Sequence, residues 1–279
     1  MKLTNYAERF VELKNIELDG MANFSNELEY LNSLSEEQIA ILFDSIKEQY
    51  GRDVFGQGYI YKIVKDSDMA DIASLSLEEK ENGIKSHKKY FVPYDKGDKD
   101  GNRWYLETPF AIAWTEDNVH FLKSNSGKKG KGMPVVRNPQ FYFREGFCWN
   151  NVLNPQARLL KVKLKGESVN DVGSMSLYPN NDLINSKYCI ALLNSNLIFD
   201  YYRVFINCTV NIQINDLRQL PIVIPTEIEM NEIVSLVDKA IEIKKEVSMG
   251  LISENDSKVP LCEIESQIDK LVNIIYGFE

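Results

Sequence analysis

The sequence predicts an α+β fold, in which a β-rich lobe is flanked by helices and followed by a C-terminal helical pair. Short apolar runs separated by Gly, Pro, Asn and Asp clusters fill the middle of the chain. Apolar residues then recur at helical spacing toward the end. A composition of 44% hydrophobic and 26% charged residues over 279 positions is that of a folded chain. We expect a helical lead-in at 1–54, a β-rich domain at 55–225 and a helical pair at 226–279.

Two capping boxes predict helices in the first third of the chain. Ser35 and Gln38 precede apolar residues on one helical face, at positions 39, 42, 43 and 46, and Gly51 ends that run. Residues 56–65 (GQGYIYKIVK) alternate β-branched and aromatic side chains and predict a strand. Ser76 and Glu79 form the second box, which opens a short helix closed by Gly83.

The region 89–144 has the pattern of a β-rich segment with substantial loops. Its apolar runs are KYFVP, RWYL, FAIAW, VHFL and FYFR. A further strand is expected around 159–164, and residues 183–206 predict a mostly buried helix. VNIQI at 210–214 alternates with period two and predicts a strand, and Pro225 sets a boundary.

The helical pair is predicted from two amphipathic runs. The first has apolar residues at 233, 234, 237, 240 and 241, and the second at 261, 264, 268, 271, 272 and 275, with Gly277 at its end. This spacing predicts two helices that pack on each other or on the sheet.

Charge is distributed unevenly along the chain. The formal net charge is −9, but residues 85–165 hold 16 Lys/Arg against 7 Asp/Glu, which gives +9 there and −18 outside. All three tryptophans, at 104, 114 and 149, lie in the same block, as does the loop NSGKKGKGMP at 125–134. Such a basic block is typical of a phosphate-binding surface or of an ordinary solvated face.

The motifs of several enzyme classes are missing from the sequence. There is no Gly-x-Ser-x-Gly elbow, no phosphate loop and no G-x-G-x-x-G fingerprint. Residues 138–141 (NPQF) are similar to the Asn-Pro-Pro-Tyr motif of adenine methyltransferases, but Gln140 replaces the second proline. The four cysteines are widely spaced and only two histidines accompany them, so free thiols are expected and a zinc site is not. We therefore expect no catalytic or metal-binding residues and no cofactor in this chain.

Five blocks in order resemble one protein family. They are FVPYDKGDKDGNRWYLETPFAIAW (91–114), FYFREGFCWNNV (141–152), ALLNSN (191–196), VNIQINDLRQLPI (210–222) and EIESQIDKLVNIIYG (263–277). Together they resemble the C-terminal part of Type IIG restriction-modification enzymes and related adenine-specific DNA methyltransferases, over roughly residues 55–279. The resemblance implies a target recognition domain that binds and reads double-stranded DNA. A separate methyltransferase domain or subunit would use S-adenosylmethionine.

The resemblance and the charge pattern together give a set of candidate DNA-binding residues. PYDKG (93–97) and RWY (103–105) match one family block, and Cys148 stands where members often carry Thr or Ser beside the Trp. Arg can read guanine and Asn can read adenine in the major groove, while lysines position the duplex through phosphates. The candidates are Lys96, Arg103, Lys123, Lys128, Lys129, Lys131, Arg137, Arg144, Asn150, Asn211 and Gln213.

Two other functions stay open from the sequence. The chain could be a protein-interaction scaffold dominated by its terminal helices, or a small metal-dependent nuclease whose carboxylates are not grouped in sequence. No apolar run reaches the roughly 20 residues of a membrane helix, and no N-terminal signal peptide is evident. A cytoplasmic protein is therefore expected, without a membrane partner.

Overall fold

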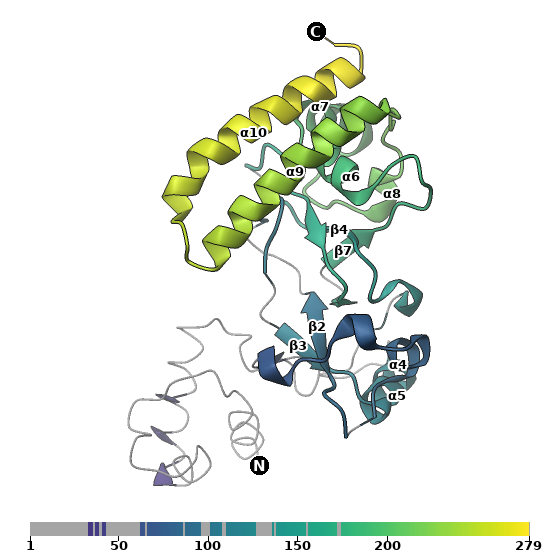
Figure 1. Ribbon diagram of the computed structural model, residues 1–279, viewed down its shortest axis with the longest axis vertical. Helices are drawn as coiled ribbons and strands as arrows, with labels where there is room; N and C mark the ends of the chain where they lie inside the picture. Colours follow the sequence, from purple (N-terminus) through teal and green to yellow (C-terminus); the bar gives the residue numbers. More distant parts are fainter. Residues whose placement is uncertain are drawn as a thin grey trace. The chain divides into compact units, whose positions relative to one another are not determined.

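The chain folds into two compact units, each built from two stretches of sequence. The computed structural model (Figure 1) describes residues 33–35, 37–38, 41–42, 62–64, 66–85, 87–95, 101–107, 110–126, 136, 138–154, 156–171 and 174–278. Unit 1 comprises Met1–Tyr94 and Pro109–Gln140, and unit 2 comprises Asp95–Thr108 and Phe141–Glu279. Both contain helices and short antiparallel strands, so the α+β prediction is confirmed.

Among its described residues, unit 1 contains a small antiparallel sheet and several helical segments. Strand β3 (Phe110–Ala113) lies between β1 (Lys62–Ile63) and β2 (Phe91–Asp95), with Phe91 opposite Ala113. Helices α4 (Leu77–Asn82) and α5 (Glu116–Asn125) contact each other. Buried Trp114 follows β3 directly, and its indole N–H donates to the carbonyls of Glu79 and Lys80 at 3.2 and 3.1 Å. This tryptophan therefore joins the sheet to α4.

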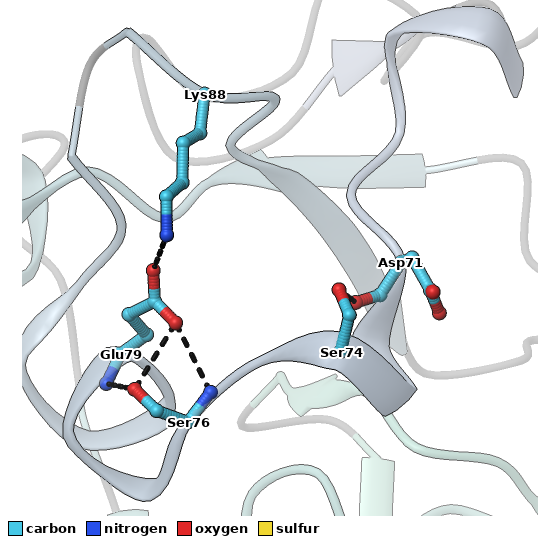
Figure 2. A network of polar contacts seen from close by, with 5 residues as sticks. All are labelled: Asp71, Ser74, Ser76, Glu79 and Lys88. Atoms are coloured by element: carbon cyan, nitrogen blue, oxygen red, sulfur yellow. Dashed lines mark hydrogen bonds and ion pairs between the residues drawn. The ribbon is translucent and has the colours of Figure 1, made fainter.

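The predicted capping box of α4 is present, and Figure 2 shows its contacts. The Ser76 hydroxyl accepts from the Glu79 N–H at 3.1 Å, and the Glu79 carboxylate accepts from the Ser76 N–H at 3.0 Å. The Lys88 ammonium lies 2.6 Å from the same carboxylate. These contacts, led by the Lys88 hydrogen bond, lower the pKa of Glu79 to about 2. The Asp71 carboxylate similarly caps the preceding short turn by accepting from the Ala73 N–H at 3.1 Å. The backbone carbonyl of Asp71 accepts from the Ser74 hydroxyl at 2.8 Å (Figure 2).

Gly83 ends α4 as predicted, and the structure gives the reason. Its φ of +105° is a conformation that residues with side chains rarely adopt. A Cβ atom there would lie 2.6 Å from the backbone of Thr115 and Glu116. The helix thus ends where only glycine lets the chain pass the start of α5.

The N-terminal capping box is also present. The Ser35 N–H donates to the Gln38 side-chain oxygen at 2.8 Å, and the Gln38 N–H donates to the Ser35 hydroxyl at 3.2 Å. Residues 37–38 and 41–42 are helical. The remaining predicted features of this region, at 39–40 and 43–51, and most of the strand predicted at 56–65 lie outside the described residues.

Unit 2 combines a three-stranded antiparallel sheet with a helical layer. Strand β4 (Gly146–Asn150) is central between β5 (Lys163–Lys165) and β7 (Ser174–Leu177), and β6 (Val169–Asn170) precedes β7. Helix α6 (Ser186–Leu193) contacts β4 and β5 on one side and α9 (Glu227–Ser248) on the other. Buried side chains of β4, α6, α9 and α10 (Glu254–Ile275) form one core. The sheet therefore has a continuous apolar support.

The predicted C-terminal helical pair is confirmed, and α9 and α10 lie side by side (Figure 1). Helix α9 begins with a capping box between Thr226 and Glu229, and α10 begins at the N-cap Ser253. Ile264, Ile268 and Val272 are buried along α10 at intervals of four. That spacing puts them on one helical face, which packs into the core of unit 2.

The β-rich prediction for 89–144 was too broad. Strands form at KYFVP and FAIAW, but VHFL lies in helix α5. There the Thr115 hydroxyl accepts from the Asn118 N–H at 3.2 Å, and Val119 and Leu122 are buried one turn apart. RWYL contributes only an isolated bridge at Trp104 among the described residues, and FYFR begins in a 3-10 turn, Pro139–Phe141. Helix capping and i, i+3 burial override the apparent strand pattern of VHFL.

Two predictions in the last third also need correction. Residues 183–206 form α6, then α7 (Asn196–Tyr201) and a π-helical turn (Tyr202–Ile206), because Asn194 leaves the helix to bind the Val162 backbone at 2.8 and 2.7 Å. VNIQI is not a strand. It makes an isolated bridge between Asn211 and Val152, and Gln213 then becomes the N-cap of α8 (Ile214–Leu217).

Candidate nucleic-acid interface

An exposed arginine rests on two stacked aromatic rings at the start of β4. The rings of Phe141 and Tyr178 are nearly parallel, at 7°, with centroids 5.2 Å apart. The guanidinium carbon of Arg144 lies 5.4 Å from each ring centroid. A guanidinium on an aromatic face is held by cation–π attraction and still presents its N–H groups. We call Phe141, Tyr178 and Arg144 the arginine platform.

A buried lysine supports the arginine platform from inside unit 2. Lys165 is 2% exposed, and its ammonium donates to the carbonyls of Arg144, Gly166 and Ser168 at 3.2, 2.8 and 3.2 Å. It also lies 5.7 Å from the Tyr178 ring centroid. Burial lowers the pKa of Lys165 to about 8. Lys165 thus fixes the backbone that carries Arg144, and its ammonium is engaged inside the fold.

Gly146 allows Tyr178 to approach β4. A Cβ atom at Gly146 would lie 2.6 Å from the Leu177 carbonyl oxygen and 2.6 and 2.9 Å from two carbons of the Tyr178 ring. The Tyr178 hydroxyl also donates to the Asn170 side-chain oxygen at 3.4 Å, and burial raises the pKa of Tyr178 to about 12. The glycine of the FREGF segment therefore has a packing role, as the residue against which the ring lies.

Side chains with carboxamide groups lie at the other end of β4. The Asn150 amide donates to the Val152 carbonyl at 3.0 Å, and Val152 forms the bridge with Asn211. Asn211 and Gln213 are exposed on either side of Ile212, which is buried. Both side chains are therefore accessible to a ligand, although the segment is not the strand that the sequence predicts.

A small pocket opens beside Asn150. It has a volume of about 160 Å³ and is lined by Gly101, Asn150, Val152, Leu153, Asn154, Leu160 and Lys161. Every lining residue belongs to unit 2. Sequence reasoning counted Lys161 only as part of the basic block and missed it as a site residue. It missed Tyr178 entirely, because nothing in the SLYP segment points to a ring that holds an arginine.

Two candidate residues are engaged within their units. Arg103 pairs with Glu265 of α10 at 2.5 Å, and the same carboxylate oxygen accepts from the Trp104 indole N–H at 3.0 Å. In unit 1, the Lys123 ammonium donates to the Glu81 carbonyl of α4 at 2.8 Å. Both cations therefore have a structural partner.

The remaining candidates lie outside the described residues. They are Lys96, Lys128, Lys129, Lys131 and Arg137. The two described residues that flank the glycine- and lysine-rich loop are joined. The Val136 N–H donates to the Ser126 hydroxyl at 2.9 Å, and that hydroxyl donates to the Val136 carbonyl at 3.2 Å. The structure thus brings Asn150 near Asn211 and puts Arg144 at the opposite end of β4.

No protein-family model matches the chain, and no curated protein matches it. In the part of the chain that the structure describes, no helix has both the length and the apolar character needed to cross a membrane.

Proposed function

We propose that this chain binds double-stranded DNA as the target recognition domain of a restriction-modification adenine-N6 methyltransferase. The arginine platform is the observation that carries the proposal, and the five sequence blocks support it. Arg144 is exposed yet held over two rings, so less side-chain entropy is lost when it binds a ligand. Its planar N–H groups suit bidentate recognition of guanine O6 and N7 or of a phosphate.

The carboxamides at the far end of β4 complement Arg144 chemically. Asn150, Asn211 and Gln213 carry the amide groups that pair with adenine N6 and N7. The six residue steps from Arg144 to Asn150, of which the last four lie in β4, span at most about 20 Å at roughly 3.3 Å each. That distance corresponds to about six base pairs at 3.4 Å along the duplex axis. An arginine and a carboxamide cluster separated in this way fit recognition of two parts of one short site.

The proposal assigns binding to this chain and chemistry to a partner. A methyltransferase domain or subunit would hold S-adenosylmethionine and transfer the methyl group. Adenine-N6 methylation requires the base to leave the duplex, so this chain would hold the duplex while the base is extruded. A cytoplasmic location, where cellular DNA is accessible, belongs to the same proposal.

A protein-interaction scaffold is the second candidate. Val204 and Phe205 on the π-helical turn are each 72% exposed, and Met249 and Leu251 are exposed where α9 ends. Exposed large apolar side chains of this kind are typical of protein contacts. A scaffold would bind a protein partner through these residues and would show no salt-dependent DNA binding.

The test is fluorescence anisotropy of the full chain with duplex DNA across a salt series. Duplexes are first selected from a random pool and compared with unselected ones. We expect selective binding that Arg144→Ala weakens about five- to 150-fold on selected duplexes, because a good bidentate contact contributes roughly 1–3 kcal/mol of discrimination. Arg144→Lys keeps the charge without the planar donors and should not restore the affinity that Arg144→Ala loses. Lys239→Ala, which removes one exposed charge from α9, is the control.

A triple variant at Lys128, Lys129 and Lys131 tests the phosphate contribution of the loop. Its salt dependence should be shallower by about 0.9 for each phosphate that the loop no longer neutralises. A full chain that binds no duplex even at low salt, alone or with a methyltransferase subunit, would contradict the proposal and favour the scaffold.

A further inference from the structure

The loop that carries Asn211 is held by one carboxylate of helix α8. Oδ2 of Asp216 accepts from the side-chain NH₂ group of Asn207 at 2.8 Å and from the backbone N–H of Gln213 at 2.9 Å. Asn207 lies at the start of the loop and Gln213 at its end. Asp216 therefore joins the two ends of the segment 207–213, which we call the carboxamide loop.

A third hydrogen bond connects the same carboxylate oxygen to the core. The Tyr202 hydroxyl donates to Oδ2 of Asp216 at 3.3 Å, and Tyr202 is fully buried. A carboxylate oxygen can accept several hydrogen bonds, and its charge makes each of them stronger than a bond to a neutral acceptor. An asparagine at 216 would offer one oxygen and an NH₂ group, which cannot accept. The three converging donors therefore favour a carboxylate at this position.

Asn207 connects Asp216 to the backbone of Asn211. The NH₂ group that donates to Asp216 also donates to the Asn211 carbonyl at 2.9 Å. The side-chain oxygen of Asn207 accepts from the Thr209 N–H at 2.8 Å, so both ends of the Asn207 amide are engaged. The Arg203 guanidinium, on the π-helical turn, donates to the Thr209 carbonyl at 2.7 Å. The loop backbone is therefore fixed at Thr209 and at Asn211.

The carboxamide loop is also joined to the chain that follows β4. The Leu153 N–H donates to the Val210 carbonyl at 2.8 Å, and the Ile212 N–H donates to the Asn151 carbonyl at 3.0 Å. Between these contacts the Asn211 side chain is exposed, and its carboxamide makes no hydrogen bond to any described residue. A fixed backbone thus presents an amide whose donor and acceptor are both available. Bidentate pairing with adenine N6 and N7 uses these two groups.

We propose that Asp216 is a positioning residue for base recognition, which fixes the carboxamide loop so that Asn211 meets an adenine edge without rearrangement. The inference rests on the proposed function and deepens it, because it names a residue that sets selectivity through another side chain. A recognition group is precise only when hydrogen bonds behind it hold its position. A loop that is already ordered also loses less conformational entropy on binding. The charge of Asp216 by itself repels phosphates, so any gain in selectivity has to come through the loop.

Asp216→Asn tests this role, and Asp200→Asn is the matched control. Asp200 is exposed on α7, and its side chain makes no ion pair or hydrogen bond with any described residue, so this variant removes a charge alone. Anisotropy of the full chain gives the ratio of its affinities for selected and unselected duplexes. Asp216→Asn should reduce this ratio about fivefold or more, the lower end of what one bidentate base contact contributes. Asp200→Asn should leave the ratio unchanged.

A double variant shows whether Asp216 acts through Asn211. Asn211→Ala alone should reduce the same ratio, because it removes the amide that reads the base. Asp216→Asn should then have a smaller effect in the Asn211→Ala background than in the wild type. A merely structural role would instead weaken binding to all duplexes alike. Equal reductions of the ratio in the two backgrounds would overturn the inference, because Asp216 would then act independently of Asn211.

Asn207→Ala provides a second test, including the case in which Asp216→Asn does not fold. It removes the side chain that connects Asp216 to Asn211 and leaves the Tyr202 and Gln213 hydrogen bonds to the carboxylate in place. We expect a similar reduction of the ratio, with an unchanged salt slope because no phosphate contact is removed. An unchanged ratio in either folded variant, beside a selective wild type, would overturn the role of Asp216 and leave the DNA-binding proposal standing. If the wild type binds no duplex or does not select among duplexes, the proposed function itself fails.

Discussion

Replacing Gly146 by alanine tests whether the close approach of Tyr178 to β4 builds the arginine platform. The added Cβ would lie 2.6 Å from the Leu177 carbonyl oxygen and from one Tyr178 ring carbon. Neither atom belongs to a flexible end, since Leu177 pairs with Phe147 in the sheet. The ring of Tyr178 must therefore shift, and Arg144 must lose part of its support.

The expected cost follows from the packing. Inserting a methyl group where the neighbours cannot yield typically destabilises a protein by about 1–3 kcal/mol. Gly166→Ala is the matched control, because a Cβ atom at Gly166 meets nothing within 4 Å and its φ is not left-handed. That variant should stay within about 0.5 kcal/mol of the wild type, as surface substitutions usually do.

Urea unfolding at pH 7 measures the two stabilities, and anisotropy on a selected duplex measures binding. We expect Gly146→Ala to lose stability and affinity together. In the double variant with Arg144→Ala, the decrease in affinity should be less than the sum of the single decreases, because both changes disable one platform. Equal unfolding free energies for Gly146→Ala and Gly166→Ala would refute the packing argument. Additive decreases in affinity would refute the link between Tyr178 and Arg144.

Three further predictions concern stability. The folded-state pKa of Lys165, about 8, lies below its ordinary value of 10.5. The unfolded state therefore binds more protons between these two values, so the Lys165 contribution to stability should rise with pH there. The rise should amount to about 1.5 kcal/mol from pH 8 to roughly pH 9.5. Burial raises the pKa of the Cys148 and Cys189 thiols, which therefore lower stability over the same pH range. Urea titrations should thus show the Lys165 contribution as a rise in the stability of the wild type relative to Lys165→Met. Ser76→Ala should cost about 0.5–2 kcal/mol in the same assay, and Ser76→Asp, which keeps a capping oxygen, should cost less. Glu265→Ala removes the partner of Arg103 and of the Trp104 indole and should cost about 1–3 kcal/mol, whereas Glu265→Gln should recover part of it. Equal destabilisation by Ala and Gln at position 265 would show that neither hydrogen bond contributes.

Local signals in the sequence were sufficient for some elements. The capping boxes at Ser35 and Ser76 depend on residues three positions apart, and the burial of α10 follows from spacing along one helix. Interactions between residues three or four positions apart are determined by the local sequence, and tertiary contacts did not override them.

Other elements depended on contacts that no local pattern encodes. Asn194 interrupts the predicted helix at 183–206 because its side chain binds Val162, which lies 32 positions earlier. Arg103 pairs with Glu265 of α10, and Tyr178 meets Gly146 across two strands. The left-handed conformation of Lys161 has no sequence signal, because lysine has no intrinsic preference for it. The arginine platform and the pocket therefore became visible only when distant segments were brought together.

The folded structure changes the interpretation of the basic block at residues 85–165. From the sequence alone, the net charge of +9 over residues 85–165 suggests one surface of many equivalent cations. In the folded chain, Lys163 and Lys165 are buried, while Lys88, Arg103 and Lys123 bind carboxylates or carbonyls within their own units. A uniform basic surface would show a graded decrease in affinity as any lysine or arginine is removed. Because these cations are engaged within the fold, the decrease should instead concentrate at Arg144, which is exposed on the arginine platform. Replacing Arg144 should change which duplexes are selected, whereas replacing a lysine that contacts only phosphates should change how steeply all duplexes respond to salt.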